Sequence, residues 1–325
     1  MILVTGGAGY VGSHAAQALK DAGFEPVIFD NFSSGHRDFV KETPTVNGDI
    51  CNNSDLESVF ERFDIDGVLH FAGRAVVEES KERPYLYYET NVVGGWNLLR
   101  VMKAASVGYL IFSSSCAIYG HPQSSSLAED HPKLPINPYG ETKLAFERSL
   151  AWSKKEHGLE YLALRYFNAS GADPDLRFGE DHNPETHLIP LVLSAAAGRR
   201  DDFIINGTDY STSDGTCVRD YVHVSDLAVA HVKGLQLLMS GKISSQSINL
   251  GTGLGSSVRE VIATARKITG RQFRVEIGPS RPGDPSSLIA NTELAAKLLD
   301  WEPQNSELEN ILKTAWDWTR KRNNI

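Results

Sequence analysis

A tyrosine and a lysine four residues apart form the strongest candidate for chemistry in this chain. Of the 11 tyrosines, Tyr139 alone has a lysine four positions on, in the stretch PYGETK at residues 138–143. Positions i and i+4 lie on one face of a helix. The Lys143 ammonium can therefore favour the Tyr139 phenolate and lower its pKa from about 10. This pair predicts a general base, although a helix-surface pair without chemistry has the same spacing.

Serine hydroxyls precede this pair, where a buried strand is expected to end. The stretch FSSSCAIYG at residues 112–120 follows the apolar run that begins at Tyr109. Ligands of open parallel sheets bind at the carboxyl ends of strands. A hydroxyl at Ser115 could therefore hydrogen-bond the substrate oxygen whose proton Tyr139 handles. Ser113 and Ser114 could equally cap a turn. Together, Ser115, Tyr139 and Lys143 predict an oxidoreductase that uses serine, tyrosine and lysine.

A glycine-rich turn at the start of the chain predicts a dinucleotide site. Gly6, Gly9 and Gly12 follow the apolar run at residues 2–5 at intervals of three. Absent side chains let the backbone approach a pyrophosphate, and the helix that follows offers unpaired N–H groups. Asp30 ends the next apolar run, where a carboxylate would accept from the ribose hydroxyls of NAD and repel the 2′-phosphate of NADP. A turn without ligand and a solvated Asp30 are the alternatives.

The rest of the first half supplies the elements that must position these groups. Short apolar runs alternate with helical patterns, which predicts a Rossmann-like, doubly wound parallel α/β sheet with a smaller α/β substrate-binding domain. Residues 1–168 are predicted to form the NAD-binding domain. Residues 169–325 are predicted to form mainly the substrate domain, with some segments returning to the first. Strands are expected at residues 2–5, 26–29, 67–71, 109–113, 161–165 and 203–205. Helices are expected at residues 9–22, 85–105, 139–157, 225–238, 257–269 and 306–320.

The composition excludes several classes of protein. The 325 residues carry a formal net charge of −9 without a block of Lys or Arg, which argues against a nucleic-acid partner. No apolar run reaches the length of a membrane span, and the first residues do not resemble a signal peptide. Cys51, Cys116 and Cys217 lack the spacing of a zinc site or a redox pair, so we expect reduced cysteines, no metal site and a cytoplasmic location.

Motifs along nearly the whole chain resemble those of the UDP-glucose 4-epimerases, within the extended short-chain dehydrogenase/reductase family. The most specific is DGTCVRDYVHV at residues 214–224. The others are TGGAGYVGSH (5–14), FDN (29–31), GDI (48–50), HFAG (70–73), FSSS (112–115), PYG (138–140), LRYFN (164–168) and RPGD (281–284).

The resemblance implies roles for residues that the chemistry above does not reach. It places a larger set of side chains and glycines around NAD: Gly6, Gly9, Tyr10, Val11, Gly12, Asp30, Asn31, Asp49, Ile50, Phe71, Ala72, Asn91, Ser113, Tyr139, Lys143 and Tyr166. It places a second set around the UDP-sugar: Ser115, Tyr139, Asn168, Arg219, Arg281 and Asp284. Arginine suits a diphosphate because its guanidinium binds phosphate oxygens in a bidentate fork. An ion pair of Arg219 with Asp220 or Asp226 is the alternative.

The resemblance also implies a mechanism. Tyr139 would take the proton of the sugar 4-hydroxyl while hydride passes from carbon 4 to tightly bound NAD. The 4-keto sugar would then turn over and receive hydride on its other face, which converts UDP-galactose to UDP-glucose. A homodimer is expected through the helices at residues 85–105 and 139–157.

Several alternatives remain open on the sequence. UDP-N-acetylhexosamine or UDP-xylose and UDP-arabinose could replace the hexose, and Leu288 occupies the place of a residue that limits sugar size in relatives. A 4,6-dehydratase or a decarboxylase is disfavoured because Cys116 and Ala117 stand where a dehydratase carries an acid and a base. A non-enzymatic NAD sensor is disfavoured by the presence of all three catalytic residue types. Ala75 replaces a lysine of some relatives, and Arg74 could supply that charge.

Overall fold

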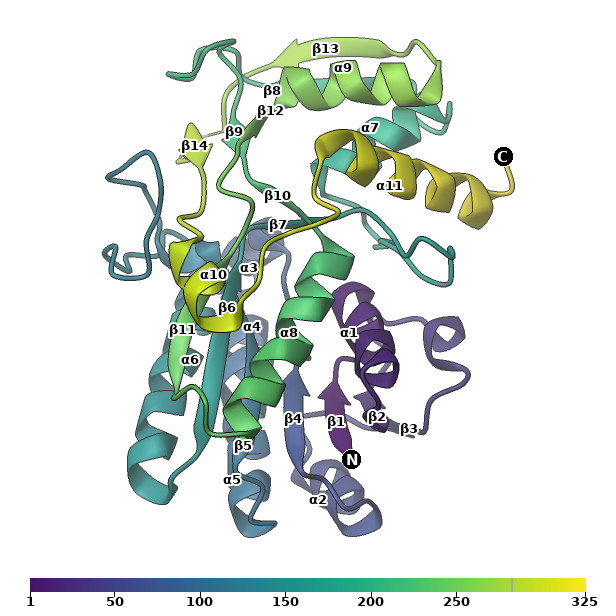
Figure 1. Cartoon of the computed structure of the whole chain (residues 1–325). Coiled ribbons are helices and arrows are strands. Elements are labelled where there is room, and N and C mark those ends of the chain that lie inside the picture. Colours follow the sequence, from purple (N-terminus) through teal and green to yellow (C-terminus); the bar gives the residue numbers. More distant parts are fainter. Residues whose placement is uncertain (282) are drawn as a thin grey trace.

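A computed structural model describes residues 1–281 and 283–325, so Pro282 of the RPGD motif lies outside the described residues. A large α/β part in the lower half of Figure 1 carries a smaller part above the arrowheads of its strands. The smaller part is built from elements between residues 188 and 323. The carboxyl ends of the sheet strands therefore face the smaller part.

The large part is built on one parallel sheet. Seven strands of the described chain lie in the order β11-β6-β5-β4-β1-β2-β3, and every neighbouring pair is parallel. Their bounds are β1 (Ile2–Thr5), β2 (Pro26–Asp30), β3 (Thr45–Asn47), β4 (Gly67–His70), β5 (Tyr109–Ser115), β6 (Glu160–Tyr166) and β11 (Gln246–Leu250). This confirms the predicted Rossmann-like class.

Both faces of the sheet are buried, which explains why its strands are continuous apolar runs rather than alternating ones. In β1, Ile2 and Val4 enter one apolar core and Leu3 enters the other. Helices α1 (Tyr10–Asp21) and α8 (Val224–Met239) pack together over the first core. The second core lies under α2 (Asn53–Arg62), α5 (Gly95–Ala104) and α6 (Pro138–His157).

Local signals set the ends of α6, the helix that carries the predicted catalytic pair. The Asn137 side chain accepts from the Gly140 N–H at 2.9 Å, and Pro138 occupies the first turn. Gly158 ends the helix with φ +78, in the left-handed region that glycine adopts without strain. The capping residues therefore define a 20-residue helix close to the predicted one.

The helix predicted for residues 85–105 is instead divided into three elements. These are α4 (Pro84–Tyr87), the π-helical segment η2 (Tyr88–Gly94) and α5. A Cβ on Gly94 would lie 2.6 Å from Ile50, and one on Gly95 would lie 2.4 Å from Phe146. This segment therefore packs so closely on its neighbours that it requires glycine there.

The smaller part has its own apolar core. Its elements are α7 (Leu188–Ala196), α9 (Val258–Thr269), α11 (Leu308–Asn323) and the paired strands β8 (Asp202–Asn206) and β13 (Arg274–Gly278). Short strands join the two parts: β7 (Asn168–Ser170), β9 (Val218–Arg219), β10 (Tyr221–His223), β12 (Ser256–Ser257) and β14 (Ser287–Leu288). The remaining elements are η1 (Arg37–Val40), α3 (Val77–Glu82), η3 (Cys116–Ile118) and α10 (Glu293–Leu299).

The predicted strands and most of the predicted helices are present with small shifts of their ends. Elements that sequence reasoning did not predict include β3, β11, α2, α7 and α10. Strand β11 pairs with β6 and so extends the central sheet from a point far along the chain. Three of its five residues, Gln246, Ser247 and Asn249, are polar, which explains why a search for apolar runs did not find this strand.

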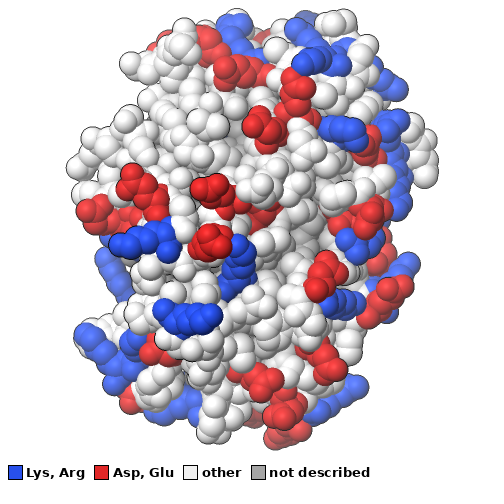
Figure 2. Space-filling model, in the orientation of Figure 1, with Lys and Arg blue, Asp and Glu red and all other residues white. Residues whose placement is uncertain are grey.

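Charges of both signs are interspersed on the face shown in Figure 2. Among the described residues, no helix combines the length and the apolar character that a membrane crossing needs.

A buried ion pair ties α6 to three strands of the sheet. Arg165 on β6 donates to Glu147 on α6 through Nε at 2.9 Å and Nη2 at 2.6 Å, and these side chains are only 4% and 7% exposed. Glu147 also accepts from Ser114 on β5 at 2.5 Å and from Ser247 on β11 at 3.2 Å. Because four donors share this carboxylate, its removal would leave several buried polar groups unpaired.

We therefore expect Glu147→Leu to lower the free energy of unfolding by about 3–5 kcal/mol, the usual cost of leaving a buried charge unpaired. Urea denaturation measures this change. Glu78→Leu is the matched control, because Glu78 pairs with Lys81 on the surface, where its side chain is 62% exposed. Its cost should stay below about 1 kcal/mol. Equal losses in both variants would show that the Glu147 network does not stabilise the fold.

Candidate functional site

The predicted site residues gather along the carboxyl edge of the sheet, facing the smaller part (Figure 1). Gly6 follows β1, Asp30 ends β2, and Phe71 follows β4. Ser115 ends β5 and Tyr166 ends β6. Parallel strands end on the same side of a sheet, so residues far apart in sequence are brought to one edge.

The glycine-rich loop has the geometry of a phosphate cradle. Gly6 has φ +70, and a Cβ there would lie 2.4 Å from the Ala72 backbone nitrogen. A Cβ on Gly12 would lie 2.3 Å from the Gly6 carbonyl oxygen. Gly9 precedes the first turn of α1 and has no side chain with which to cap it. The first N–H groups of α1 are therefore available to an anion, as a pyrophosphate requires.

Asp30 is a buried brace for this loop rather than a solvated carboxylate. Its Oδ2 accepts from the Ala8 N–H at 2.9 Å, and its Oδ1 accepts from the Phe32 N–H at 2.8 Å. Burial raises the pKa of Asp30, while these two N–H groups oppose the rise. Its carboxylate thus stays fixed beside the loop, in the position predicted to receive the ribose.

The predicted adenine side is organised around Asp49. Asn31 donates to Asp49 Oδ2 at 2.9 Å, and the Cys51 N–H donates to Oδ1 at 2.8 Å. Ile50 is buried beneath them, and Asn97 donates to its carbonyl oxygen at 3.1 Å. The structure therefore brings Asn31, Asp49 and Ile50 together next to the end of β2.

Asn91, predicted to line the dinucleotide groove, joins the loop after β4 to α6. Its Oδ1 accepts from the Arg74 N–H at 2.8 Å, and its Nδ2 donates to the Arg74 carbonyl oxygen and to Thr142 Oγ1, both at 3.0 Å. The residue is 4% exposed and lies within η2. Asn91 therefore positions the wall that Phe71 and Ala72 form, and π-helical turns are often found at such sites.

Lys143 is buried at the centre of the candidate site. Its Nζ donates to the Ser113 carbonyl oxygen at 2.8 Å and lies 5.8 Å from the centre of the Tyr139 ring. Burial lowers the pKa of Lys143 to about 8, against the opposing effect of Glu147 one turn on. Spacing on α6 thus produces the predicted Tyr139–Lys143 pair, and Ser113 is the group that holds the ammonium.

The pKa of Tyr139 differs from the prediction made from its spacing. Burial raises it to about 12, the Ser115 hydroxyl acts against this rise, and Cys116 adds to it. The Lys143 ammonium lies over the ring and is engaged by a carbonyl oxygen, which explains why it does not lower the pKa of this phenol. A further positive charge is needed to make Tyr139 a base near neutral pH.

Ser113 also connects the pair to β6. Its hydroxyl and the Tyr166 hydroxyl form a hydrogen bond, while its carbonyl oxygen receives Lys143. Ser115, two residues on, accepts from the Ala117 N–H at 3.2 Å and so caps η3. The two serines predicted to take part in the site are therefore both at the site, one as a connector and the other beside Tyr139.

Arg219, which was predicted to bind the substrate, forms an ion pair with neither Asp220 nor Asp226, the two partners considered from the sequence. Arg219 donates to Asp284 Oδ1 at 2.5 Å, and its side chain is 13% exposed. Asp220 accepts instead from the loop at residues 252–253 and from Ala290, while Asp226 accepts from residues 305–306. The structure thus brings two predicted substrate residues together from positions 65 apart in the chain.

The other predicted substrate residues lie on the same short strands or next to them. Asn168 begins β7, and it pairs with Tyr221 of β10, two residues after Arg219. Leu288 pairs with Arg219 in the register of β9 and β14, and it packs against the same apolar cluster as Cys116. Arg281 is exposed, and its N–H donates to the Tyr210 hydroxyl at 3.2 Å.

Sequence reasoning missed two groups of residues near this edge. The first group is Glu147 and its partner Arg165, which position α6; the sequence signal for it was an acidic residue four places after Lys143. The second group is a cluster of Glu and His in the loop before α7, at residues 180–187.

Arg74, considered from the sequence as a replacement for a missing lysine, forms an ion pair with Glu79 at 3.4 Å.

Comparisons with known proteins agree on one family. A model of the NAD dependent epimerase/dehydratase family matches residues 2–251. A UDP-glucose 4-epimerase of Halalkalibacterium halodurans is 47% identical over 320 residues, which cover 98% of this chain and 96% of that protein.

Solved structures of similar proteins have the same fold. The UDP-glucose 4-epimerase of Brucella ovis, in complex with NAD, superposes with a TM-score of 0.95 and 46% identity over 97% of each chain. The enzyme of Bifidobacterium longum, in complex with NAD+ and UDP, gives a TM-score of 0.94 and 34% identity over 99% of each chain.

The close approach at Gly12 leads to a testable expectation. A Cβ in Gly12→Ala would meet the Gly6 carbonyl, so the cradle must open and the dinucleotide retained by the purified protein should fall at least about tenfold, or about 1.4 kcal/mol in binding. Absorbance and enzymatic assay of nucleotide released on denaturation measure this. Gly108→Ala is the control, because a Cβ there meets nothing within 4 Å. Equal retention by the two variants would rule out the cradle assigned to Gly12.

Proposed function

Because the chain belongs to the NAD dependent epimerase/dehydratase family, we propose that it interconverts UDP-galactose and UDP-glucose by inverting carbon 4 of the sugar. The observation that carries this proposal is the group of Ser115, Tyr139 and buried Lys143 at the carboxyl edge of the sheet, beside the glycine-rich loop. Full-length relatives at 44–47% identity bear the name UDP-glucose 4-epimerase, which supports the same reaction.

The residues present fit NAD. The glycine cradle at residues 6–12 and the free N-terminus of α1 suit the pyrophosphate, and Asp30 suits the ribose hydroxyls. Asp49 and Ile50 would lie by the adenine, while Ser113 and Tyr166 would flank the reactive ring. When bound, NAD would supply the hydride acceptor and donor for carbon 4, and the positive charge of its oxidised ring would favour the Tyr139 phenolate.

The chain's own groups account for the proton transfers. Tyr139 takes the proton of the 4-hydroxyl and later returns one to the oxygen of the transient 4-keto sugar. Ser115, at the end of β5, donates a hydrogen bond to that oxygen and keeps the oxygen within reach of Tyr139. Lys143 donates one of its N–H groups to the Ser113 carbonyl oxygen, and its remaining N–H groups would serve to bind NAD rather than to lower the pKa of Tyr139.

The substrate is held through its UDP part. Arg219 uses Nη2 for Asp284 and Nη1 for the Val218 carbonyl oxygen, and its remaining N–H groups can bind a diphosphate. Arg281 and Asn168 would contact the same portion. Firm binding of the diphosphate and loose binding of the hexose would let the keto sugar present either face. Residues 1–168 would thus serve mainly NAD, and residues 169–325 mainly the UDP-sugar.

We further propose a cytoplasmic homodimer. All three cysteines are free, as a reducing compartment maintains them. Large apolar side chains are exposed on the elements predicted for the interface: Tyr85, Tyr88, Val93, Trp96 and Trp152. Exposed apolar groups on α4, η2, α5 and α6 favour burial against a second copy.

The proposal is tested by supplying UDP-galactose to the purified protein with no NAD added. Formation of UDP-glucose is expected, because retained NAD is regenerated in each cycle. UDP-N-acetylgalactosamine and UDP-xylose, assayed in parallel, rank the sugars by their relative kcat/KM. Failure to convert any of these nucleotides, even with NAD supplied, would refute the proposed reaction.

Tyr139→Phe should lower kcat by about 10²–10⁴, the contribution of a positioned general base, while NAD content and UDP affinity stay near wild type. Stopped assays of the UDP-glucose formed measure kcat, and titration calorimetry with UDP measures the UDP affinity. Assay of the nucleotide released on denaturation measures the NAD content. Tyr161→Phe is the control, because Tyr161 lies near the opposite end of β6. If Tyr139→Phe retained more than a few per cent of activity, Tyr139 would not be the main base.

A further inference from the structure

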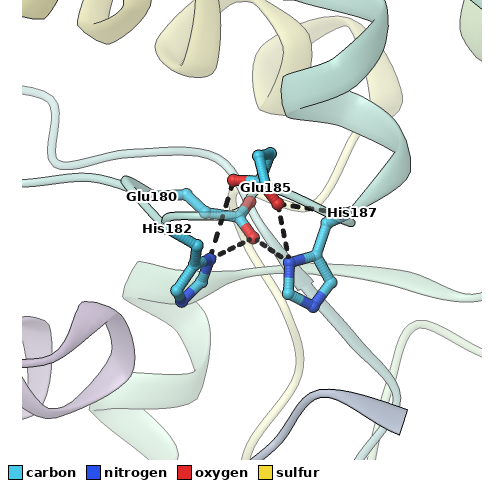
Figure 3. Close-up of side chains that lie close together, drawn as sticks. All are labelled: Glu180, His182, Glu185 and His187. Carbon is cyan, nitrogen blue, oxygen red and sulfur yellow. Dashed lines mark hydrogen bonds and ion pairs between the residues drawn. The ribbon is translucent and has the colours of Figure 1, made fainter. Parts of the chain in front are cut away.

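Two glutamates and two histidines converge in the segment between β7 and α7 (Figure 3). They are Glu180, His182, Glu185 and His187, and one ligand atom from each lies within 4.8 Å of the others. In Figure 3 both imidazole rings turn a nitrogen toward the two carboxylates, which lie between them. The catalytic groups described above do not include any of these four residues.

The distances suit a single small ion at the centre. His187 Nδ1 lies 2.8 Å from Glu180 Oε1 and 3.1 Å from Glu185 Oε1. His182 Nδ1 lies 3.4 Å from Glu180 Oε1 and 3.6 Å from Glu185 Oε2. Bonds of about 2.0–2.2 Å in a tetrahedron place neighbouring ligand atoms about 3.3–3.6 Å apart. Small side-chain rotations would therefore close all four ligands around one ion.

The chemistry of the donors selects the ion. We propose that Glu180, His182, Glu185 and His187 bind one divalent transition-metal ion, for which Zn²⁺ is the best match. Imidazole nitrogen suits zinc and its neighbours, whereas Mg²⁺ and Ca²⁺ prefer sets made of oxygen alone. Two carboxylates also balance the two charges of the ion.

The segment that carries these ligands is fixed from several sides. The Trp318 Nε1–H donates to the Glu180 carbonyl oxygen at 3.0 Å, and His36 bonds to the Asp181 carbonyl oxygen at 2.8 Å. Glu185 Oε1 accepts from the N–H groups of Thr186 and His187 at 2.7 and 2.8 Å. These contacts hold the ligands in place, as a preformed metal site requires.

A polar atom without a partner points to the same centre. His182 Nδ1 is buried and has no hydrogen-bond partner within residues 1–281 and 283–325. Its nearest neighbours are the carboxylates at 3.4 and 3.6 Å, which are ion-pair rather than hydrogen-bond distances. A metal at the centre would satisfy this nitrogen, whereas buried polar groups usually have partners.

The position of the cluster indicates what the ion would do. The His182 ring lies 6.3 Å from the ring of Tyr10, which begins α1 and donates to the Gly171 carbonyl oxygen at 2.6 Å. His187 directly precedes α7. Four protein ligands describe a closed, structural site. The ion would therefore link the start of α7, through His187, to the segment whose His182 ring lies near Tyr10, without joining the chemistry, and the site does not depend on the proposed reaction.

Metal binding by the untagged full-length protein tests the site. After treatment with a chelator, the protein is equilibrated with micromolar free Zn²⁺ and the bound metal is measured by mass spectrometry. We expect one ion per chain and a raised Tm. Cobalt(II) in the same site should give the intense visible absorption of tetrahedral coordination. Two imidazolium–carboxylate ion pairs without a metal are the competing arrangement, and they would give neither result.

Variants separate this cluster from adventitious ligands such as the cysteines. His182→Asn with His187→Asn should lower zinc affinity at least about a hundredfold, given at least about tenfold for each ligand. Glu185→Gln keeps the shape of its side chain and should also abolish the cobalt spectrum. His121→Asn is the control, because this histidine is exposed and outside the cluster. Absence of stoichiometric metal in the unaltered chain, or wild-type binding by the double variant, would overturn the proposal.

Discussion

The buried carboxylate of Glu147 is the interaction on which the candidate site depends. It lies one turn after Lys143 on α6 and receives hydrogen bonds from Ser114, Ser247 and Arg165, on three different strands. A carboxylate so far from water is tolerated only when its charge is balanced and its oxygens are satisfied. These bonds fix both the rotation of α6 about its own axis and its position along the sheet, and α6 is the helix that presents Tyr139.

The parallel sheet supplies the second constraint. Because its strands run the same way, every strand ends at one edge, and the loops that follow are free to differ. At this edge Asp30 braces the glycine-rich loop, Asn91 braces the loop after β4, and Ser113 receives Lys143. The partners of these three groups all belong to the protein, so the chain itself organises this edge of the sheet.

This organisation has an electrostatic consequence. Burial lowers the pKa of Lys143 to about 8 and raises the pKa of Tyr139 to about 12, so the folded chain disfavours charge on both. A group of this kind becomes a base when another positive charge approaches the phenol. The oxidised cofactor carries such a charge, which would couple proton removal by Tyr139 to the presence of the hydride acceptor.

The sequence by itself determined the class of fold, the glycine cradle and the Tyr139–Lys143 pair, because these follow from local periodicity and spacing. Apolar runs fixed most strands of the sheet, and the caps of α6 fixed its ends. The tertiary structure alone decided the partners that lie far apart in the chain. It paired Arg219 with Asp284, placed polar β11 beside β6, and gathered the Glu180 cluster. It also reversed the predicted pKa shift of Tyr139, because desolvation depends on everything packed around a group and spacing describes only its own helix.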